Sequence, residues 1–177
     1  MKTSKILKLV VALSLSFFNS CSSDNSPAEK LNEIKVNEKQ FEIVNATISE
    51  SNTFDGVTEF DLYLASSGLT VNSSNYLTGK GDYLYLRLFS SSETELSAGN
   101  YVYNDQDSNS FLINSSVHFF NYDSELGDGQ SGDVDIELGS VSVAVENGKY
   151  IITVNLTDEN DARVTGYYSG TIEGFNE

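Results

Sequence analysis

The chain has 177 residues, and its 26 acidic and 10 basic side chains give a formal net charge of −16. So much negative charge repels nucleic acid and anionic membrane surfaces, so no nucleic-acid partner is expected. Ten Tyr and ten Phe against a single Pro exclude a disordered acidic tail, and one Cys with one His excludes a disulfide framework or a Cys-rich zinc site.

The first twenty residues have the three parts of a secretory signal. Lysines at positions 2, 5 and 8 are followed by the apolar run 9–18, and a small residue, Ser20, precedes Cys21. This run is too short to span a bilayer, which needs about 20 apolar residues. We therefore expect residues 1–20 to be a signal peptide, whose removal takes three lysines and leaves a net charge of −19.

The stretch Phe18-Asn19-Ser20-Cys21 resembles the lipobox of bacterial lipoproteins. This resemblance implies that Cys21 is acylated and that the protein is anchored by lipid to the bacterial outer membrane, facing the periplasm or the cell exterior. Residues 21–30 would then form a polar tether, and residues 31–177 the folded domain. Two or more acyl chains hold a protein durably, because each buried methylene contributes about 0.8 kcal/mol. The alternative is an ordinary secretory signal in which Cys21 is incidental.

Beyond the tether, apolar and polar residues alternate in a series of segments that predict strands, with no helix between them. Asn147-Gly148 separates two of these segments and is the strongest short-range signal for a hairpin. The fold class expected is all-β, as an antiparallel β-sandwich, with a β-barrel as the alternative. The predicted strands are 41–48, 59–64, 83–89, 101–103, 111–120, 140–145, 150–156 and 163–172.

Two stretches of the domain resemble those of small β-sandwich lipoproteins of the Bacteroidetes type. One runs from Leu96 to Tyr103, and the other from Gly139 to Gly170. Their shared features are glycines at turns and bulges and alternating core residues. The resemblance implies a β-sandwich and no known activity.

Catalytic motifs are sparse in this chain. A Ser-His-Asp triad would have to use His118, and no Gly-x-Ser-x-Gly elbow surrounds any serine. We interpret His118 as a strand histidine beside aromatic residues. Paired carboxylates can hydrolyse glycosides, but they are a weak signal in this chain. With 26 acidic residues, some pair will lie at a suitable distance by chance. We expect a protein without enzymatic activity, and an extracytoplasmic hydrolase is the least favoured alternative.

Acidic loops are the candidates for a metal site, and Ca²⁺ is the one cofactor that they suggest. Asp105, Asp107 and Asn109 place oxygen ligands at alternate positions, as an EF-hand loop does, but Ser occupies the positions where that loop needs Gly and Glu. A second loop holds Asp128, Asp133 and three glycines, and residues 158–161 form a third acidic cluster. The competing interpretation is solvated turns, which Asp and Asn favour.

Tyrosines that alternate away from the core residues are the candidates for ligand contacts. Tyr83 and Tyr85 are expected on the face of strand 83–89 opposite to its leucines. Tyr167 is expected on the face of its strand opposite to Tyr168. Exposed aromatic rings stack on sugars or anchor a protein partner, whereas the competing interpretation is a second buried face.

These observations predict a lipid-anchored binding or accessory module, whose partners are the membrane, through its anchor, and a glycan or a protein. One alternative is a polysaccharide-binding lipoprotein that uses Tyr83, Tyr85 and Tyr167. Another is an assembly component that pairs through a sheet edge, in the first place through the final strand, because strand edges template pairing with another chain.

Labelling with palmitate tests the role of Cys21. The wild-type protein should incorporate radiolabelled palmitate and Cys21→Ala should not, because the chain has no other thiol that could carry the lipid. Label that survives the substitution, or a wild type without label, would contradict the lipoprotein interpretation.

Overall fold

The computed structural model describes residues 30–74, 76–104, 109, 111–130 and 132–174. Strands make up 68% of the structure, and the described residues include one short 3-10 helix, η1 (Ser124–Gly129). None of the described helices is long and apolar enough to cross a membrane. The strands are β1 (Glu33–Val36), β2 (Lys39–Glu42), β3 (Asn45–Phe54), β4 (Val57–Ala65), β5 (Leu69–Val71), β6 (Leu77–Ser90), β7 (Gly99–Tyr103), β8 (Leu112–Asp123), β9 (Val134–Glu146), β10 (Lys149–Asp158) and β11 (Arg163–Gly170).

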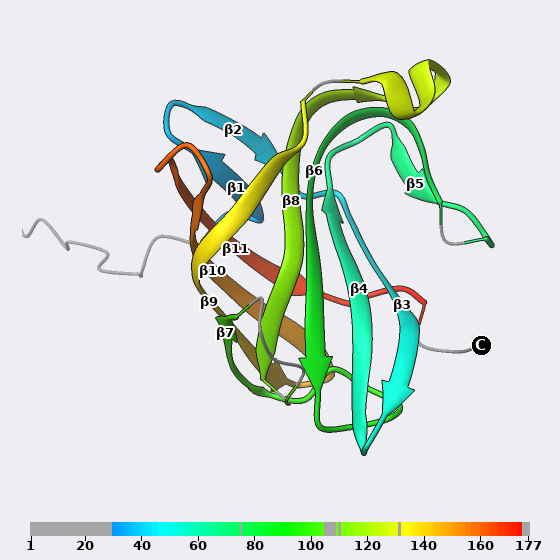
Figure 1. Cartoon of the computed structure of the whole chain (residues 1–177), viewed down its shortest axis with the longest axis vertical. Helices are drawn as coiled ribbons and strands as arrows, with labels where there is room; N and C mark the ends of the chain where they lie inside the picture. Colours follow the sequence, from blue (N-terminus) through cyan, green and yellow to red (C-terminus); the bar gives the residue numbers. More distant parts are fainter. Residues whose placement is uncertain (1–29, 75, 105–108, 110, 131, 175–177) are drawn as a thin grey trace, which may run out of the picture.

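One hydrogen-bonded path connects the strands. Its order is β2-β1-β11-β10-β9-β7-β8-β6-β4-β3, with β5 added on β6. The pairings are antiparallel, apart from the parallel pair β7–β8. The sheet curls into a half-barrel, in which β9 to β11 and β3, β4 and β6 form opposite sides (Figure 1). The all-β prediction is therefore confirmed, while a sandwich of two separate sheets is not confirmed.

The segment after β11 connects the two sides of the curl. The Glu173 amide donates to the Ala46 carbonyl at 2.9 Å, and the Ile48 amide donates to the Glu173 carbonyl at 2.8 Å. This segment continues from the red strand in Figure 1 towards β3 and covers part of the β3 edge. β11 itself lies between β1 and β10. The prediction that the final strand offers a free edge is wrong, because both of its sides are paired.

Alternating apolar side chains fill the inside of the curl. Leu62 and Leu64 of β4 and Leu84, Leu86 and Leu88 of β6 are completely buried there, as the alternation in the sequence predicted. Burial of one such side chain stabilises the fold by about 1.5–3 kcal/mol. Strands with the same period supply the other side of this core, from Ile34, Val141, Val143, Ile152, Val154, Leu156 and Val164.

A smaller apolar cluster lies on the other face of β6. Tyr83 and Phe119 are buried there with Ala65 and Leu69, under the β5 segment and near η1. The rings of Tyr83 and Phe119 stack with centroids 5.8 Å apart. β6 therefore buries both of its faces, which agrees with the interpretation of Tyr83 as part of a second buried face.

The hairpin between β9 and β10 confirms the turn predicted at Asn147-Gly148. Both residues have a positive φ, 52° and 75°, as the tight hairpin turn requires. The predicted strand 41–48 is wrong in its bounds, because Ile43 and Val44 connect β2 to β3 instead of continuing one strand. Their amides are bonded to the carbonyls of Asn32 and Ala65.

Two glycines of this hairpin allow a matched test of backbone packing. Gly139 has φ +111°, and a Cβ there would lie 2.3 Å from the Asn155 carbonyl oxygen, whereas a Cβ at Gly148 meets nothing within 4 Å. Gly148→Ala should cost about 1 kcal/mol of unfolding free energy through its positive φ alone. Gly139→Ala should cost roughly 3 kcal/mol or more, because strain and a backbone clash add. Urea unfolding measures both, and equal losses would contradict the close packing of β9 on β10.

Candidate functional site

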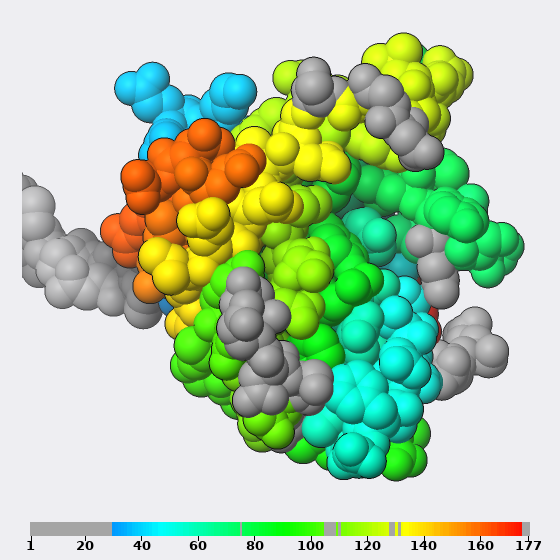
Figure 2. Space-filling view, in the orientation of Figure 1, coloured from blue at the N-terminus to red at the C-terminus, as the bar shows by residue number. Residues whose placement is uncertain are grey.

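A cavity of about 770 Å³ opens at one end of the curled sheet. The β1–β2 turn and the β10–β11 turn form its rim, and they lie beside each other in Figure 2 as the blue and orange atoms. β8 and the start of β9 form the wall opposite them. Two turns that are distant in sequence meet here because β1 pairs with β11.

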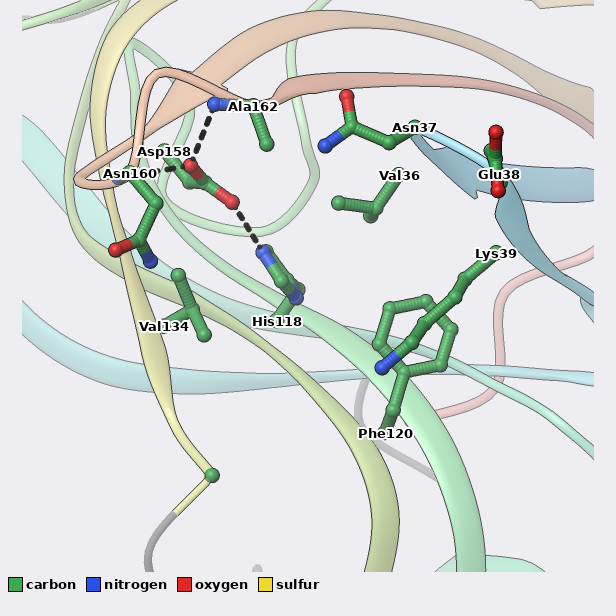
Figure 3. A pocket seen from close by; sticks show the side chains of 11 residues that line it. Val36, Asn37, Glu38, Lys39, His118, Phe120, Val134, Asp158, Asn160 and Ala162 are labelled. Carbon is green, nitrogen blue, oxygen red and sulfur yellow. Dashed lines mark hydrogen bonds and ion pairs between the residues drawn. The ribbon is translucent and has the colours of Figure 1, made fainter.

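Apolar side chains line much of this cavity, and charged groups stand at its rim. Val36, Phe120, Val134 and Ala162 supply the apolar surface (Figure 3). The Lys39 ammonium lies 5.0 Å from the centroid of the Phe120 ring, which is the distance of a cation–π contact. Pockets with such walls and a few polar groups are typical of small-molecule sites.

A buried hydrogen bond between His118 and Asp158 lies at the cavity wall. Nε2 of His118 is 2.8 Å from Oδ2 of Asp158, and the two residues are only 4% and 3% exposed. Oδ1 of Asp158 accepts from the amides of Asn160 at 2.9 Å and Ala162 at 2.8 Å. The carboxylate therefore caps the β10–β11 turn and fastens this turn to β8 (Figure 3).

The surroundings of Asp158 favour its charged form. Burial raises the pKa of the carboxyl, but the hydrogen bond from His118 and the bonds from the Ala162 and Asn160 amides outweigh burial, so the pKa lies below its ordinary value of 3.8. Because an ionised carboxylate can only accept, Nε2 of His118 carries the hydrogen of this bond.

The other ring nitrogen of His118 is a buried polar atom without a partner. Among the described residues, no hydrogen-bond partner lies near Nδ1, which points away from Asp158 (Figure 3). In the neutral ring this nitrogen is an acceptor. An unsatisfied buried polar atom of this kind costs about 1–3 kcal/mol of folding stability. The described residues of the cavity wall include no Ser, Thr or Cys that could act as a nucleophile.

Sequence reasoning did not find this pair. The interpretation of His118 as a strand histidine beside aromatic residues holds, since the Phe120 ring is 5.8 Å away, edge to face. Asp158 was grouped with the acidic cluster 158–161, whereas its side chain organises a turn. The two residues meet because β8 pairs with β9, and β9 with β10. The sequence signal that could have identified this turn is Asp158 followed two residues later by Asn160, because an Asp side chain often accepts from the amide two residues on.

The predicted calcium ligands do not form a cluster in the described part of the chain, where no three His, Cys, Asp or Glu side chains approach closely enough to share a metal ion. Asn109 and Asp133 are exposed. Burial and the neighbouring Asp135 raise the pKa of Asp133. Asp105, Asp107, the side chain of Asp128 and Cys21 lie outside the described residues.

The structure does not bring the three predicted tyrosines together. Tyr83 and Tyr85 lie on β6 and Tyr167 on β11, and four strands separate these two in the sheet. The Tyr85 hydroxyl donates to Asp61 at 2.6 Å, which together with burial raises its pKa. Tyr167 instead lies under the Lys30 ammonium, 4.8 Å from the ring centroid.

Comparisons with known proteins gave no match, whether with family models, with curated proteins or with solved structures.

Replacement of Asp158 tests the buried pair. Asp158→Asn should lower the unfolding free energy at neutral pH by about 2 kcal/mol, because it removes a charged acceptor of three hydrogen bonds. The depressed pKa means that Asp158 stabilises the fold above about pH 4, and that this contribution is lost as the pH falls through its folded pKa.

Urea unfolding between pH 2 and 7 measures both effects. The difference between wild type and Asp158→Asn should shrink below about pH 4. Asp161→Asn is the matched control in the same turn, where an exposed side chain should give a change within about 0.5 kcal/mol. A difference between wild type and Asp158→Asn that stays constant across this range would contradict the role of the ionised carboxylate.

Proposed function

We propose that this protein is a lipid-anchored, extracytoplasmic binding module without enzymatic activity, and that its ligand enters the cavity beside His118. The observation that carries the proposal is the cavity itself, whose wall presents the apolar side chains of Val36, Phe120 and Val134 beside His118. A folded protein keeps such a surface at a cost in stability, which a ligand would offset.

The cavity wall indicates the kind of ligand. An apolar body would cover Val36, Phe120 and Val134 and so lose its contact with water. The Lys39 ammonium at the rim would attract an acidic group on the same molecule.

The geometry of His118 and Asp158 favours a binding role over catalysis. Both oxygens of Asp158 accept hydrogen bonds that hold the β10–β11 turn and the imidazole in place. Nε2 of His118 is occupied by Asp158 and its Nδ1 is buried, and the described residues of the wall include no Ser, Thr or Cys that the imidazole could activate. The pair therefore shapes the wall of the cavity.

The proposed location follows from the N-terminal sequence. The lipobox-like stretch before Cys21 supports acylation and attachment to the bacterial outer membrane, facing the periplasm or the cell exterior. Residues 21–30 would act as a tether between the lipid anchor and the folded domain.

Binding of anilinonaphthalene sulfonate tests the cavity. This probe combines an apolar ring system with an anionic group, and its fluorescence rises in apolar surroundings. It should bind the wild-type protein, and Val134→Phe, which fills the cavity, should weaken binding about tenfold, or ~1.4 kcal/mol. Ala162→Phe fills the same space from the β10–β11 turn and serves as a second variant.

Val145→Phe is the matched control, because it makes the same substitution on β9 at an exposed position outside the cavity wall. It should bind the probe as the wild type does. Circular dichroism establishes that each variant is folded. A probe that does not bind, or that binds both folded filled-cavity variants as tightly as the wild type, would contradict the proposed site.

A further inference from the structure

A second hollow, of about 590 Å³, lies on the other face of the sheet. The β5 segment forms one side and η1 the other, and Figure 1 shows both at the same end of the molecule. Tyr76, Tyr83 and Tyr122 line it together with Asn72 and Asp133. None of these residues belongs to the cavity beside His118.

The floor of this hollow is a rigid group of aromatic rings. Tyr83 lies 5.4 Å from Tyr122 and 5.8 Å from Phe119, measured between ring centroids, and Phe119 lies 5.4 Å from Tyr122. Edge-to-face and stacked pairs of this kind are favourable and restrict the rings. Gly132 passes close to this group, since a Cβ there would come within 2.7 Å of the Phe119 ring.

Tyr76 differs from the rings of the floor because its side chain is 70% exposed. Its position is fixed from the backbone, as Oδ1 of Asn72 accepts from the Tyr76 amide at 3.1 Å and from the Ser74 amide at 2.9 Å. A large ring held at the rim of a hollow is available to stack on a ligand. The same bonds orient the Asn72 amide, whose nitrogen is a donor of two hydrogen bonds.

The charges around this hollow disfavour an anionic ligand. Asp133 contributes a carboxylate, and Lys80, which lies on β6 near η1, is held in ion pairs with Asp123 at 2.8 Å and Glu125 at 3.0 Å. The chain as a whole carries a net charge of −16. A neutral ligand with many hydroxyl groups escapes this repulsion and still provides donors for Asp133 and acceptors for Asn72.

We propose that the hollow between β5 and η1 binds a neutral oligosaccharide. One sugar ring presents its C–H face to the Tyr76 ring, and its hydroxyls bond to the Asn72 amide and the Asp133 carboxylate. The size of the hollow falls within the range of about 300–1,000 Å³ usual for ligand sites. This inference goes beyond the proposed function, because it assigns a second site on the opposite face of the sheet.

Isothermal titration calorimetry of the full chain tests this site with maltoheptaose, cellohexaose, xylohexaose, laminarihexaose and mannohexaose as neutral probes. At least one probe should bind, and Tyr76→Ala should weaken that binding at least about tenfold. Because Tyr76 is exposed, the substitution should leave the domain folded, and circular dichroism checks this. Leu138→Ala, at an exposed apolar position of β9 outside this hollow, is the control and should bind as the wild type does.

Three results would overturn the inference: no binding of any neutral probe at millimolar concentration, unchanged binding by Tyr76→Ala, or tighter binding of the anionic hexagalacturonate. Val134→Phe separates the two sites. It should bind the fluorescent probe of the first cavity about tenfold more weakly and keep its affinity for the oligosaccharide, so that failure of one site is distinguishable from failure of the other.

Discussion

The curl of the sheet is the constraint on which the other features of the molecule depend. The described strands have no layer of helices to pack against, so they bury their apolar side chains against each other across the curl. Leucines of β4 and β6 meet aliphatic residues of β9 to β11 there, and each fully buried side chain contributes about 1.5–3 kcal/mol. A chain with one cysteine cannot form an internal disulfide, so this burial has to supply the stability.

The same curvature places the two hollows. At one end, the turns after β1 and β10 rise above β8 and β9, and the hydrogen bond between His118 and Asp158 holds the β10–β11 turn to β8. On the outer face, the β5 segment and η1 cover part of β6 and leave a hollow lined by tyrosines. Both hollows lie where turns and short elements meet the rigid sheet, which is where binding residues are commonly found.

Alternation along single strands was predictable from the sequence. Alternation identified the buried leucines of β6 and the strands β9 to β11, and the Asn-Gly pair identified the turn at Asn147-Gly148. Each of these features depends on neighbouring residues only. It did not show that the strand starting near Phe41 breaks after Glu42, since Phe41 and Ile43 are both buried and keep the alternating pattern.

Features that depend on the order of strands in the sheet could not be predicted from the sequence. His118 and Asp158 are 40 residues apart and meet through two successive pairings. Tyr83 and Tyr167 each alternate with core residues along their own strands, but their strands, β6 and β11, are separated by four others in the sheet. The burial of Tyr83 depends in part on Leu69 of β5, a strand of three residues without a clear periodic signal.

The central claim is that a ligand enters the cavity beside His118. The nuclear magnetic resonance signals of the His118 ring test this claim most directly. His118 is the single histidine of the chain, so its ring signals can be assigned without ambiguity. These signals should move and saturate when anilinonaphthalene sulfonate is added, and they should stay in place when maltoheptaose is added. Ring signals that do not move at a saturating concentration of the fluorescent probe would contradict the account.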